Sequence, residues 1–358
     1  MKRVIHVIGT RPNFVKAAPV INALNNTCEQ FIVHTGQHYS KSMSESFLET
    51  LRIPKPDINL NVGSGTHGYQ TARVLENIEK YFIEQQPNLV VVYGDVNSTL
   101  AAALAAKKLN IKVAHVESGL RSNDPYMPEE VNRVLTDKIS TYHFLTEEDA
   151  KNNLSREGIR TDDAYFVGNT MIDSLVDTIE KTNSDFIEQN FNETKYVLFT
   201  CHRPSNVDTK EGLRKVAEII KSIEYPIVFP AHFRTLKNIR SFGLWDEFSG
   251  NKNLYIIEPV EYLEFLHMMK KSFFVITDSG GVQEETTFLG IPCLTFRKNT
   301  ERPSTVKFGT NTLVQNIKEI KYAISQIESG IYKKGEKPAL WDGKASQRIA
   351  KIINNVLD

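Results

Sequence analysis

The stretch LVVVYGDVNSTLAAALAAKKLNIKVAHVE, residues 89–117, decides the fold. It opens with an unbroken apolar run from Leu89 to Tyr93, which is typical of a parallel strand buried on both faces. We expect an Ala-rich helix from Asn97 to Lys108, with Asn97 or Ser98 as its N-cap, and a second strand from Lys112 to Val116. Two strands separated by one helix predict a parallel sheet with a right-handed crossover.

The same alternation continues on both sides of this stretch. A strand at Arg3 to Ile8 precedes a helix at Phe14 to Leu24, and a second series starts with a strand at Tyr196 to Thr200. This pattern predicts an α/β fold of two Rossmann-like, doubly wound domains that face each other across a cleft. We expect an N-terminal domain at 1–170 and a C-terminal domain at 171–345, with a C-terminal helix at 346–358 completing the first domain.

Composition narrows the function classes. The 358 residues include 43 Lys or Arg and 43 Asp or Glu, so the chain lacks the basic excess of a nucleic-acid-binding protein. No run approaches the roughly 18 apolar residues of a membrane span, and the N-terminus does not resemble a signal peptide. Three widely spaced cysteines, Cys28, Cys201 and Cys293, suit a reducing compartment. We therefore expect a cytoplasmic protein without bound metal, membrane insertion or nucleic acid.

A candidate phosphate site lies in the second domain. Asp278, Ser279, Gly280 and Gly281 follow a predicted strand and precede a helix, and the glycines let a ligand approach the backbone closely. The free N–H groups and the dipole of a helix N-terminus suit a diphosphate. Glu285, on the first turns of the same helix, is placed to accept hydrogen bonds from a ribose diol. The alternative is an ordinary strand–turn–helix junction with a solvated glutamate.

Cationic side chains follow strands in both domains. Arg11 and Lys16 come after the first strand of the N-terminal domain, where both can face one anion. In the C-terminal domain histidines and arginines follow two successive strands, although a single histidine is usually structural. These residues are His202, Arg203, His232 and Arg234.

Three acids are candidates for proton transfer. Asp95 and Glu117 follow consecutive parallel strands, so both carboxylates are expected at the same edge of the sheet. Residues 128–133 (PEEVNR) open a helix with Glu129 in its first turn, although acids are common there because of the helix dipole. Neighbouring negative charges raise one another's pKa, which suits proton transfer near neutral pH.

A glycine-rich segment superficially suggests a dinucleotide site. Residues 63–68 fit the pattern G-x-G-x-x-G, which binds a dinucleotide in Rossmann domains. The segment does not lie in the first βαβ unit, and the position about 20 residues further on, where an acid is required, is Asn88. We therefore expect no nicotinamide cofactor.

Short motifs are spread along nearly the whole chain. They are Gly-Thr-Arg-Pro at 9–12, Thr-Gly-Gln-His at 35–38, Gly-Asp at 94–95, His-Val-Glu-Ser-Gly-Leu-Arg-Ser at 115–122, Pro-Glu-Glu-Val-Asn-Arg at 128–133, Gly-Asn-Thr at 168–170, Thr-Cys-His-Arg at 200–203, Thr-Asp-Ser-Gly-Gly-Val-Gln-Glu-Glu at 277–285 and Thr-Glu-Arg-Pro at 300–303. In this order they resemble the motifs of the non-hydrolysing UDP-N-acetylglucosamine 2-epimerases.

The resemblance implies a fold of glycosyltransferase-B type, a homodimer and a place in polysaccharide biosynthesis. It also implies the interconversion of UDP-N-acetylglucosamine and UDP-N-acetylmannosamine. No carbonyl flanks C2–H of the sugar, so its direct removal as a proton is prohibitively hard, and departure of UDP from C1 makes it more acidic. The family is understood to eliminate UDP, leaving a 2-acetamidoglucal, and to add it back after protonation from the opposite face. This chemistry requires no cofactor.

The resemblance assigns catalytic roles. Asp95 and Glu129 are the candidates for proton transfer at C2, and Glu117 orients the sugar or tunes its neighbours. His202 and Arg11 are expected to stabilise the charge that develops on the leaving diphosphate.

The resemblance also assigns residues to substrate binding. Ser279 and Gly280 are expected to hold phosphate oxygens, Glu285 the ribose and Phe265 the uracil. The other candidates for binding the UDP-sugar are Lys16, His38, Arg133, Arg203, His232, Arg234, Gly281 and Arg302.

The sequence departs from the family pattern in three places. Asn13 stands where the family usually has Glu. His-Arg-Pro-Ser-Asn-Val at 202–207 resembles members that act on UDP-2,3-diacetamido-glucuronate, which leaves this second sugar as an alternative. Residues 65–71 replace an element that helps many members bind a second, activating substrate molecule, which argues against such activation.

Three other functions remain as alternatives. A hydrolysing epimerase would release the free sugar and UDP, but Gly-Thr-Arg-Pro in place of Gly-Thr-Arg-Ala disfavours it. A retaining glycosyltransferase of the same architecture would require an acceptor. A non-catalytic UDP-sugar sensor needs no proton-transfer groups, so the intact set of Asp95, Glu117, Glu129 and His202 argues against it.

Overall fold

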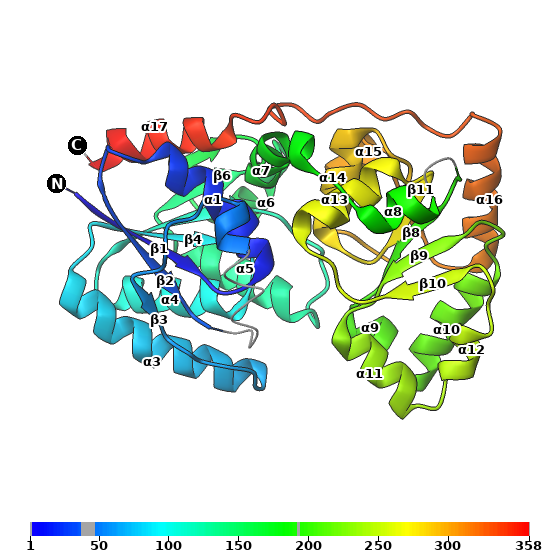
Figure 1. The fold of residues 1–358 in the computed structure, drawn as a ribbon. Coiled ribbons are helices and arrows are strands. Elements are labelled where there is room, and N and C mark those ends of the chain that lie inside the picture. Colours follow the sequence, from blue (N-terminus) through cyan, green and yellow to red (C-terminus); the bar gives the residue numbers. More distant parts are fainter. Residues whose placement is uncertain (1, 37–46, 192–193, 358) are drawn as a thin grey trace. The chain divides into compact units, whose positions relative to one another are not determined.

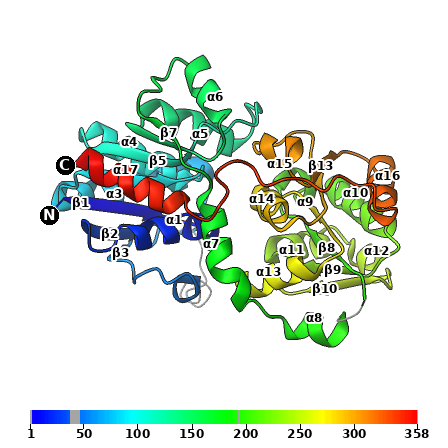
Figure 2. The same ribbon diagram turned by 90° about the horizontal axis from the view of Figure 1, so that it is seen from above.

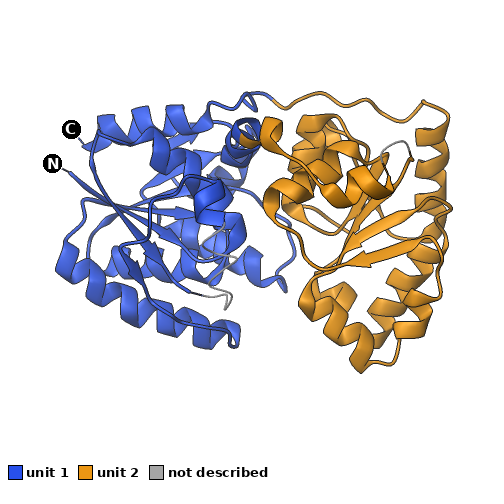
Figure 3. Cartoon of the chain, viewed as in Figure 1, with its two compact units in different colours: residues 1–177, 339–358 blue, residues 178–338 orange. Residues whose placement is uncertain are grey.

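The chain folds into two compact units. The computed structural model describes residues 2–36, 47–191 and 194–357. Unit 1 consists of residues 1–177 and 339–358, and unit 2 of residues 178–338 (Figure 3). The boundary expected from the sequence, between residues 170 and 171, lies at the start of helix α7 (Thr170–Thr178), and the units divide near the end of this helix.

Unit 1 contains a seven-stranded parallel sheet, counted over its described residues. The strand order is β3-β2-β1-β4-β5-β6-β7, so the order reverses between β1 and β4. Doubly wound sheets bind ligands beyond the carboxyl ends of the strands at this switch point. The strands are β1 (Arg3–Ile8), β2 (Glu29–His34), β3 (Ile58–Asn59), β4 (Leu89–Tyr93), β5 (Lys112–Ser118), β6 (Tyr142–Leu145) and β7 (Ala164–Phe166).

Helices cover both faces of this sheet. Helices α1 and α17 pack against each other on one face, and α3 and α4 cover the other (Figures 1 and 2). The C-terminal helix is attached to α7 because the Asp173 carboxylate accepts hydrogen bonds from the backbone N–H groups of Ala345 and Ser346. The helices of unit 1 are α1 (Arg11–Ala23), α3 (His67–Gln85), α4 (Asn97–Lys108), α5 (Pro128–Ile139), α6 (Ala150–Arg156), α7 and α17 (Ala345–Leu357).

The strand β4 and the helix α4 show how the sequence builds this core. All five residues of β4 are completely buried, as its continuous apolar run predicts. The alanines of α4 are small enough for the helix to pack between α3 and α5. The expected N-cap of α4 at Asn97 or Ser98 was wrong, because Val96 occupies the cap and Asn97 is the first helical residue.

Unit 2 contains a six-stranded parallel sheet, again counted over described residues. Its order is β10-β9-β8-β11-β12-β13, so its switch point lies between β8 and β11. The strands are β8 (Val197–Thr200), β9 (Ile227–Pro230), β10 (Leu254–Ile257), β11 (Phe274–Thr277), β12 (Cys293–Phe296) and β13 (Asn311–Val314).

The helices of unit 2 bury their apolar faces against this sheet. In α10, for example, Leu213, Val216 and Ile220 lie in the core while the charged face is exposed. The helices are α8 (Asp185–Asn190), α9 (Pro204–Val207), α10 (Lys210–Lys221), α11 (Phe233–Ser241), α12 (Trp245–Ser249), α13 (Tyr262–Lys271), α14 (Gly280–Leu289), α15 (Pro303–Lys307) and α16 (Ile317–Glu328), with a short 3₁₀ helix at Ile179–Lys181. Across the described part of the chain, no helix combines the length and apolarity needed to cross a membrane.

Candidate active site

The loop after β4 and helix α1 meet at the switch point of unit 1. Gly94 follows β4 with a φ of +61°, and a Cβ at this position would lie 2.9 Å from Nζ of Lys16. Lys16 is buried, and its Nζ donates to Oε1 of Glu117 over 2.7 Å. Glycine at position 94 therefore lets the backbone pass directly beside this ion pair.

Glu117 is the second-to-last residue of β5 and has a strained backbone conformation. Its φ is +75°, in the left-handed region, which costs a non-glycine residue about 1–2 kcal/mol. The register between β5 and β6 shifts between Val116 and Ser118, so Glu117 is the bulged residue. Its side chain is buried. Bulges and backbone strain of this kind are concentrated at functional sites.

Asp95 and Glu130 share one arginine, Arg133. Arg133 is buried in α5, and its Nη1 forms an ion pair with Oδ2 of Asp95. Its Nε and Nη2 donate to Oε2 of Glu130 over 2.9 and 2.7 Å. The Asp95 side chain is 19% exposed, so the arginine fixes the carboxylate while solvent can still reach it.

Adjacent acids at the start of α5 have different environments. Glu130 is buried and accepts hydrogen bonds from the backbone N–H groups of Ser122 at 3.0 Å and Asn123 at 2.8 Å. Burial works to raise the pKa of Glu130, but these hydrogen bonds and the charge of Arg133 outweigh it and lower the pKa. Glu129 is partly exposed, and its carboxylate has no hydrogen-bond or ion-pair partner among the residues that the structure describes. Glu130 is therefore committed to structure, whereas Glu129 is available to a ligand.

Asn13 connects the loops that follow β1 and β4. Its Oδ1 accepts hydrogen bonds from the backbone N–H groups of Gly9 at 3.2 Å and Thr10 at 3.3 Å. Its Nδ2 donates to the carbonyl oxygen of Tyr93 over 2.8 Å. A glutamate carboxylate at this position has no N–H to donate to Tyr93, so the asparagine changes how the two loops are held together.

Arg11, another sequence-selected residue, belongs to this edge of unit 1. Arg11 is the first residue of α1, and its guanidinium lies 5.2 Å from the centre of the Phe47 ring. His38 lies outside the described residues. The structure thus brings together Lys16 with Glu117 and Asp95 with Arg133.

Asp278 ties together the two loops at the switch point of unit 2. Its buried carboxylate accepts hydrogen bonds from the backbone N–H groups of His202 at 3.1 Å and Arg203 at 2.9 Å, and from Nδ2 of Asn206 at 2.9 Å. Burial works to raise the pKa of Asp278, but the nearby His202 and these hydrogen bonds outweigh it and lower the pKa. The His202 side chain lies 3.2 Å from Oδ1 and is half exposed. Asp278 therefore fixes a histidine whose imidazole faces solvent.

Helix α14 begins immediately beyond this loop. Ser279 is its N-cap, and the Ser279 side chain forms no capping hydrogen bond. Gly280 and Gly281 are the first two helical residues, and an anion can use the N–H groups of this first turn. A Cβ on Gly280 would lie 2.6 Å from Oε1 of Glu301, which itself pairs with Arg297 over 2.6 Å. Glycine is therefore required at position 280 for Glu301 to lie against the start of the helix.

The next turn of α14 carries two glutamates with separate partners. Glu285 is buried and accepts a hydrogen bond from Oη of Tyr262 over 3.1 Å. Burial raises the pKa of Glu285 to about 7, and the Tyr262 hydrogen bond opposes this shift. Glu284 is completely buried and lies 2.9 Å from Nε of Arg302. Glu285 is thus a carboxyl group that titrates near neutral pH.

The remaining candidates of unit 2 lie on α11 and α13. His232 is the N-cap of α11, and its Nδ1 accepts a hydrogen bond from the backbone N–H of Arg234. The Arg234 side chain is half exposed and pairs with Asp208. Phe265 lies on α13 and is partly buried.

Sequence reasoning did not foresee what Asp278 and Tyr262 do. Asp278 was visible as a loop residue after a predicted strand, but nothing in the sequence showed that it accepts hydrogen bonds from a second loop. Tyr262 lies 23 residues before Glu285, and an aromatic residue in an amphipathic helix usually indicates only packing.

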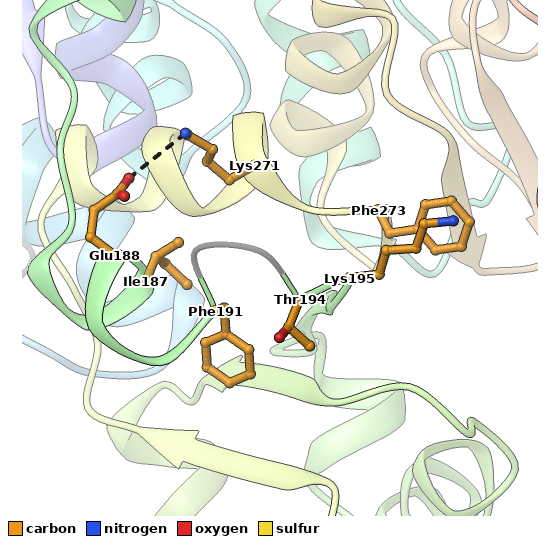
Figure 4. A pocket seen from close by; sticks show the side chains of 7 residues that line it. All are labelled: Ile187, Glu188, Phe191, Thr194, Lys195, Lys271 and Phe273. Atoms are coloured by element: carbon orange, nitrogen blue, oxygen red, sulfur yellow. Dashed lines mark ion pairs between the residues drawn. The ribbon is translucent and has the colours of Figure 1, made fainter.

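One pocket in unit 2 lies apart from these groups. It has a volume of about 290 Å³ and is formed by α8, α13 and the chain around Lys195 (Figure 4). Its lining includes Phe191 and Phe273, and Glu188 forms an ion pair with Lys271 at 3.8 Å. None of the sequence-selected residues lines it. Within residues 2–36, 47–191 and 194–357, no group of three or more His, Cys, Asp or Glu side chains is placed to hold a metal ion.

Comparison with known proteins gives a consistent family. The model of the family "UDP-N-acetylglucosamine 2-epimerase" matches residues 22–354. The UDP-N-acetylglucosamine 2-epimerase of Methanocaldococcus jannaschii is 47% identical over 358 residues, which cover 97% of each protein. A crystal structure of the UDP-GlcNAc 2-epimerase from the same organism, in complex with UDP-GlcNAc and UDP, matches with a TM-score of 0.90 at 46% identity, covering 99% of this chain and 100% of that chain.

Two further proteins show how far the similarity extends. The UDP-2,3-diacetamido-2,3-dideoxy-D-glucuronate 2-epimerase of Pseudomonas aeruginosa is 39% identical over 358 residues, covering 98% of this chain and 99% of the other. The lipopolysaccharide outer core galactosyltransferase WaaB has a TM-score of 0.53 at 14% identity, covering 99% of each chain, and shares the fold alone.

Two Rossmann-like units, each with polar groups beyond the carboxyl edge of its sheet, define a protein with a fold of glycosyltransferase-B type. The family match and the identity over nearly the whole chain then decide between the members of this class. The chain belongs to the UDP-N-acetylglucosamine 2-epimerase family.

Proposed function

We propose that the chain is a non-hydrolysing epimerase that inverts C2 of UDP-N-acetylglucosamine to form UDP-N-acetylmannosamine. The observation that carries this proposal is the different state of the acids in unit 1. Glu117 is paired with Lys16 in the interior, whereas Asp95 and Glu129 keep carboxylates that a ligand can reach. Inversion requires one group that removes a proton from one face of C2 and another that delivers a proton to the opposite face.

In the proposed reaction, the carboxylate of one acidic residue acts as a base and removes the C2 proton while the bond between C1 and the phosphate oxygen breaks. The electron pair of the C–H bond forms the C1–C2 double bond of a 2-acetamidoglucal, and UDP leaves with the electrons of the C–O bond. The second acid then protonates C2 from the other face, and UDP adds back to C1. Substrate and product have the same atoms, so neither water nor an electron carrier is consumed.

Unit 2 supplies the nucleotide contacts in this proposal. The first turn of α14, from Ser279 to Gly281, binds phosphate oxygens, and Glu285 accepts the ribose hydroxyls. His202 stabilises the charge on the departing diphosphate, because Asp278 holds its imidazole in an exposed position. Phe265 contacts the uracil.

The remaining candidates are assigned to the same substrate. Arg11 assists His202 at the diphosphate, and Glu117 orients the sugar. The other residues proposed to bind the UDP-sugar are Lys16, His38, Arg133, Arg203, His232, Arg234 and Arg302.

UDP-2,3-diacetamido-glucuronate is the alternative substrate. It is favoured by residues 202–207, which resemble members that act on this sugar, and by the 39% identity to an epimerase with that name. Comparison of kcat/KM for the two UDP-sugars decides between them, because the same elimination and re-addition can serve both.

Incubation with UDP-N-acetylglucosamine in deuterated water tests the reaction. We expect nuclear magnetic resonance to show deuterium at C2 of a sugar that is still attached to UDP. Free N-acetylmannosamine together with UDP would instead indicate a hydrolysing epimerase. The absence of exchange at C2 with either UDP-sugar would contradict the proposal.

We also propose that the enzyme is a cytoplasmic homodimer whose product supplies polysaccharide biosynthesis. Its cysteines Cys28, Cys201 and Cys293 are buried free thiols, which suits a reducing compartment. Val131 and Leu135 on α5 are each nearly half exposed and lie one turn apart, as apolar side chains in a subunit interface do. Sedimentation equilibrium tests the dimer, and a monomer at all concentrations would contradict it.

A further inference from the structure

A second buried polar cluster in unit 1 surrounds Asp137 on α5. Oδ1 of Asp137 accepts hydrogen bonds from Nδ1 of His115 at 2.6 Å and from Oγ of Ser118. Oδ2 accepts from the backbone N–H of Gly119 at 3.0 Å and pairs with Nη1 of Arg121 at 2.8 Å. All four donors belong to β5 or to the loop that follows it, and the carboxylate is completely buried.

Hydrogen bonds hold the His115 ring in place and keep the Asp137 carboxylate ionised. Nδ1 of His115 faces the Asp137 carboxylate, and Nε2 lies 2.7 Å from the carbonyl oxygen of Gly94. The Asp137 carboxylate and the Gly94 carbonyl oxygen therefore hold the His115 ring from both sides. Burial works to raise the pKa of Asp137, but His115, Arg121 and Ser118 outweigh it and hold the pKa well below its usual range. Asp137 thus remains ionised in the interior.

The cluster contacts the backbone next to two proposed catalytic residues, Glu117 and Asp95. Ser118 and Gly119, which donate directly to Asp137, are the two residues that follow Glu117. The left-handed φ of Glu117 persists only where the surrounding structure holds it. His115 extends the contact to Gly94, which immediately precedes Asp95 in the chain.

We propose that Asp137 is a positioning residue for the epimerase reaction. It holds Glu117 in its left-handed conformation and, through His115, holds the loop that carries Asp95. This inference rests on the proposed function. Asp137 touches no substrate in this role, so its loss acts through the geometry of the two acids. A displacement of about 1 Å in a catalytic group is enough to lower turnover by about 100-fold.

Substitution of Asp137 by asparagine tests the role. We expect Asp137→Asn to lower kcat by about 100-fold while KM stays within about 3-fold, because geometry and not binding is changed. Asp173→Asn is the matched control, since Asp173 is an equally buried carboxylate that accepts backbone N–H groups at the start of α17. This control is expected to lower the melting temperature but to keep kcat within about 3-fold of the wild type, at a temperature at which both proteins are folded.

A double variant separates positioning from a general structural effect. If Asp137 acts through Glu117 and Asp95, then Asp137→Asn lowers kcat by much less than about 100-fold when it is added to Glu117→Gln, because part of its effect has already been removed. The inference would be overturned if the loss in kcat of the double variant equalled the product of the losses in the two single variants. A wild-type kcat in Asp137→Asn would overturn it as well.

Ser118→Ala decides the question if Asp137→Asn does not fold. It removes one hydrogen bond to Asp137 and a contact of 2.9 Å with Nδ1 of His143, without adding a larger group. A loss in kcat of about 10-fold at an unchanged melting temperature supports the inference, and an unchanged kcat overturns it. Wild-type protein that fails to exchange C2–H in either UDP-sugar overturns the proposed function, and this inference with it. Exchange by the wild type together with an unchanged kcat in the variants overturns only the positioning role.

Discussion

Lys16 on α1 and Glu117 on β5 form an ion pair in the interior of unit 1, although they are 101 residues apart in the sequence. Nζ and Oε1 are 2.7 Å apart, and the two side chains are 5% and 2% exposed. Loss of one partner from such a pair leaves an uncompensated charge in a medium of low dielectric constant, which typically costs about 3–5 kcal/mol. The pair therefore couples the stability of unit 1 to the geometry of a proposed catalytic acid.

Lys16→Met is expected to lower the free energy of unfolding by at least about 3 kcal/mol in urea denaturation. Lys80→Met is the matched control, because Lys80 pairs with Glu76 on the exposed surface of α3, and it is expected to cost less than about 1 kcal/mol. Adding Glu117→Gln to Lys16→Met is expected to restore part of the loss, since the buried charge is then removed. Equal losses in the free energy of unfolding for the two lysine substitutions would show that the buried pair stabilises the protein no more than the exposed pair does.

The neighbours Glu129 and Glu130 are expected to separate activity from stability. Glu129→Gln lowers kcat by at least about 100-fold, as loss of a proton-transfer group does, and leaves the melting temperature unchanged. Glu130→Gln leaves Arg133 without its buried carboxylate and lowers the free energy of unfolding by about 1–3 kcal/mol. Asp95→Asn is also expected to lower kcat by at least about 100-fold while UDP still binds in calorimetry. Full activity in both Asp95→Asn and Glu129→Gln would refute the assigned roles.

Features that depend on local periodicity could be predicted from the sequence. The strand Arg3–Ile8 has the predicted bounds because its apolar residues form an almost continuous run. The motif residues Asp95 and Ser279 lie just beyond β4 and β11, as expected, because the carboxyl ends of buried parallel strands were recognised correctly.

Features that depend on contacts between distant segments could not be predicted. The N-cap of α4 was assigned wrongly because the Asn97 side chain is engaged elsewhere: it accepts from Nδ2 of Asn132 at 3.2 Å and donates to Gln70 at 2.9 Å. The bulge at Glu117 arises from the pairing of β5 with β6. The strand β6 was not predicted from the sequence. No local pattern in the sequence indicates a positive φ for a glutamate.

Gly280→Ala is expected to disturb the start of α14. The added Cβ would lie 2.6 Å from Oε1 of Glu301, which its ion pair with Arg297 holds in place. Because the added Cβ overpacks this site, we expect the free energy of unfolding to fall by about 1–3 kcal/mol. We also expect the affinity for UDP to fall by at least about 10-fold, which is about 1.4 kcal/mol. Gly68→Ala is the control, because a Cβ there meets nothing within 4 Å. Calorimetric titration with UDP checks the comparison, and indistinguishable affinities in the two variants would contradict it.

Glu285 is expected to make the stability of unit 2 depend on pH. Burial raises its pKa in the folded protein to about 7 from an ordinary value of 4.5. Between these values the folded state binds more protons than the unfolded state, so the free energy of unfolding falls as the pH rises from about 4.5 to about 7, and this contribution is lost above that range. Glu285→Gln carries no titrating group at this position. The wild type should therefore lose about 3 kcal/mol relative to this variant between pH 4.5 and pH 8 in urea denaturation.

Tyr262→Phe provides the internal check on this pH dependence. The hydroxyl of Tyr262 donates to Oε1 of Glu285 and opposes the effect of burial on its pKa. Without that donor the pKa of Glu285 rises further, so the decline in stability extends to higher pH than in the wild type. The double variant Tyr262→Phe/Glu285→Gln should show no such decline, because the titrating group is absent. A decline of the same size in Glu285→Gln as in the wild type would mean that another group in the chain is responsible.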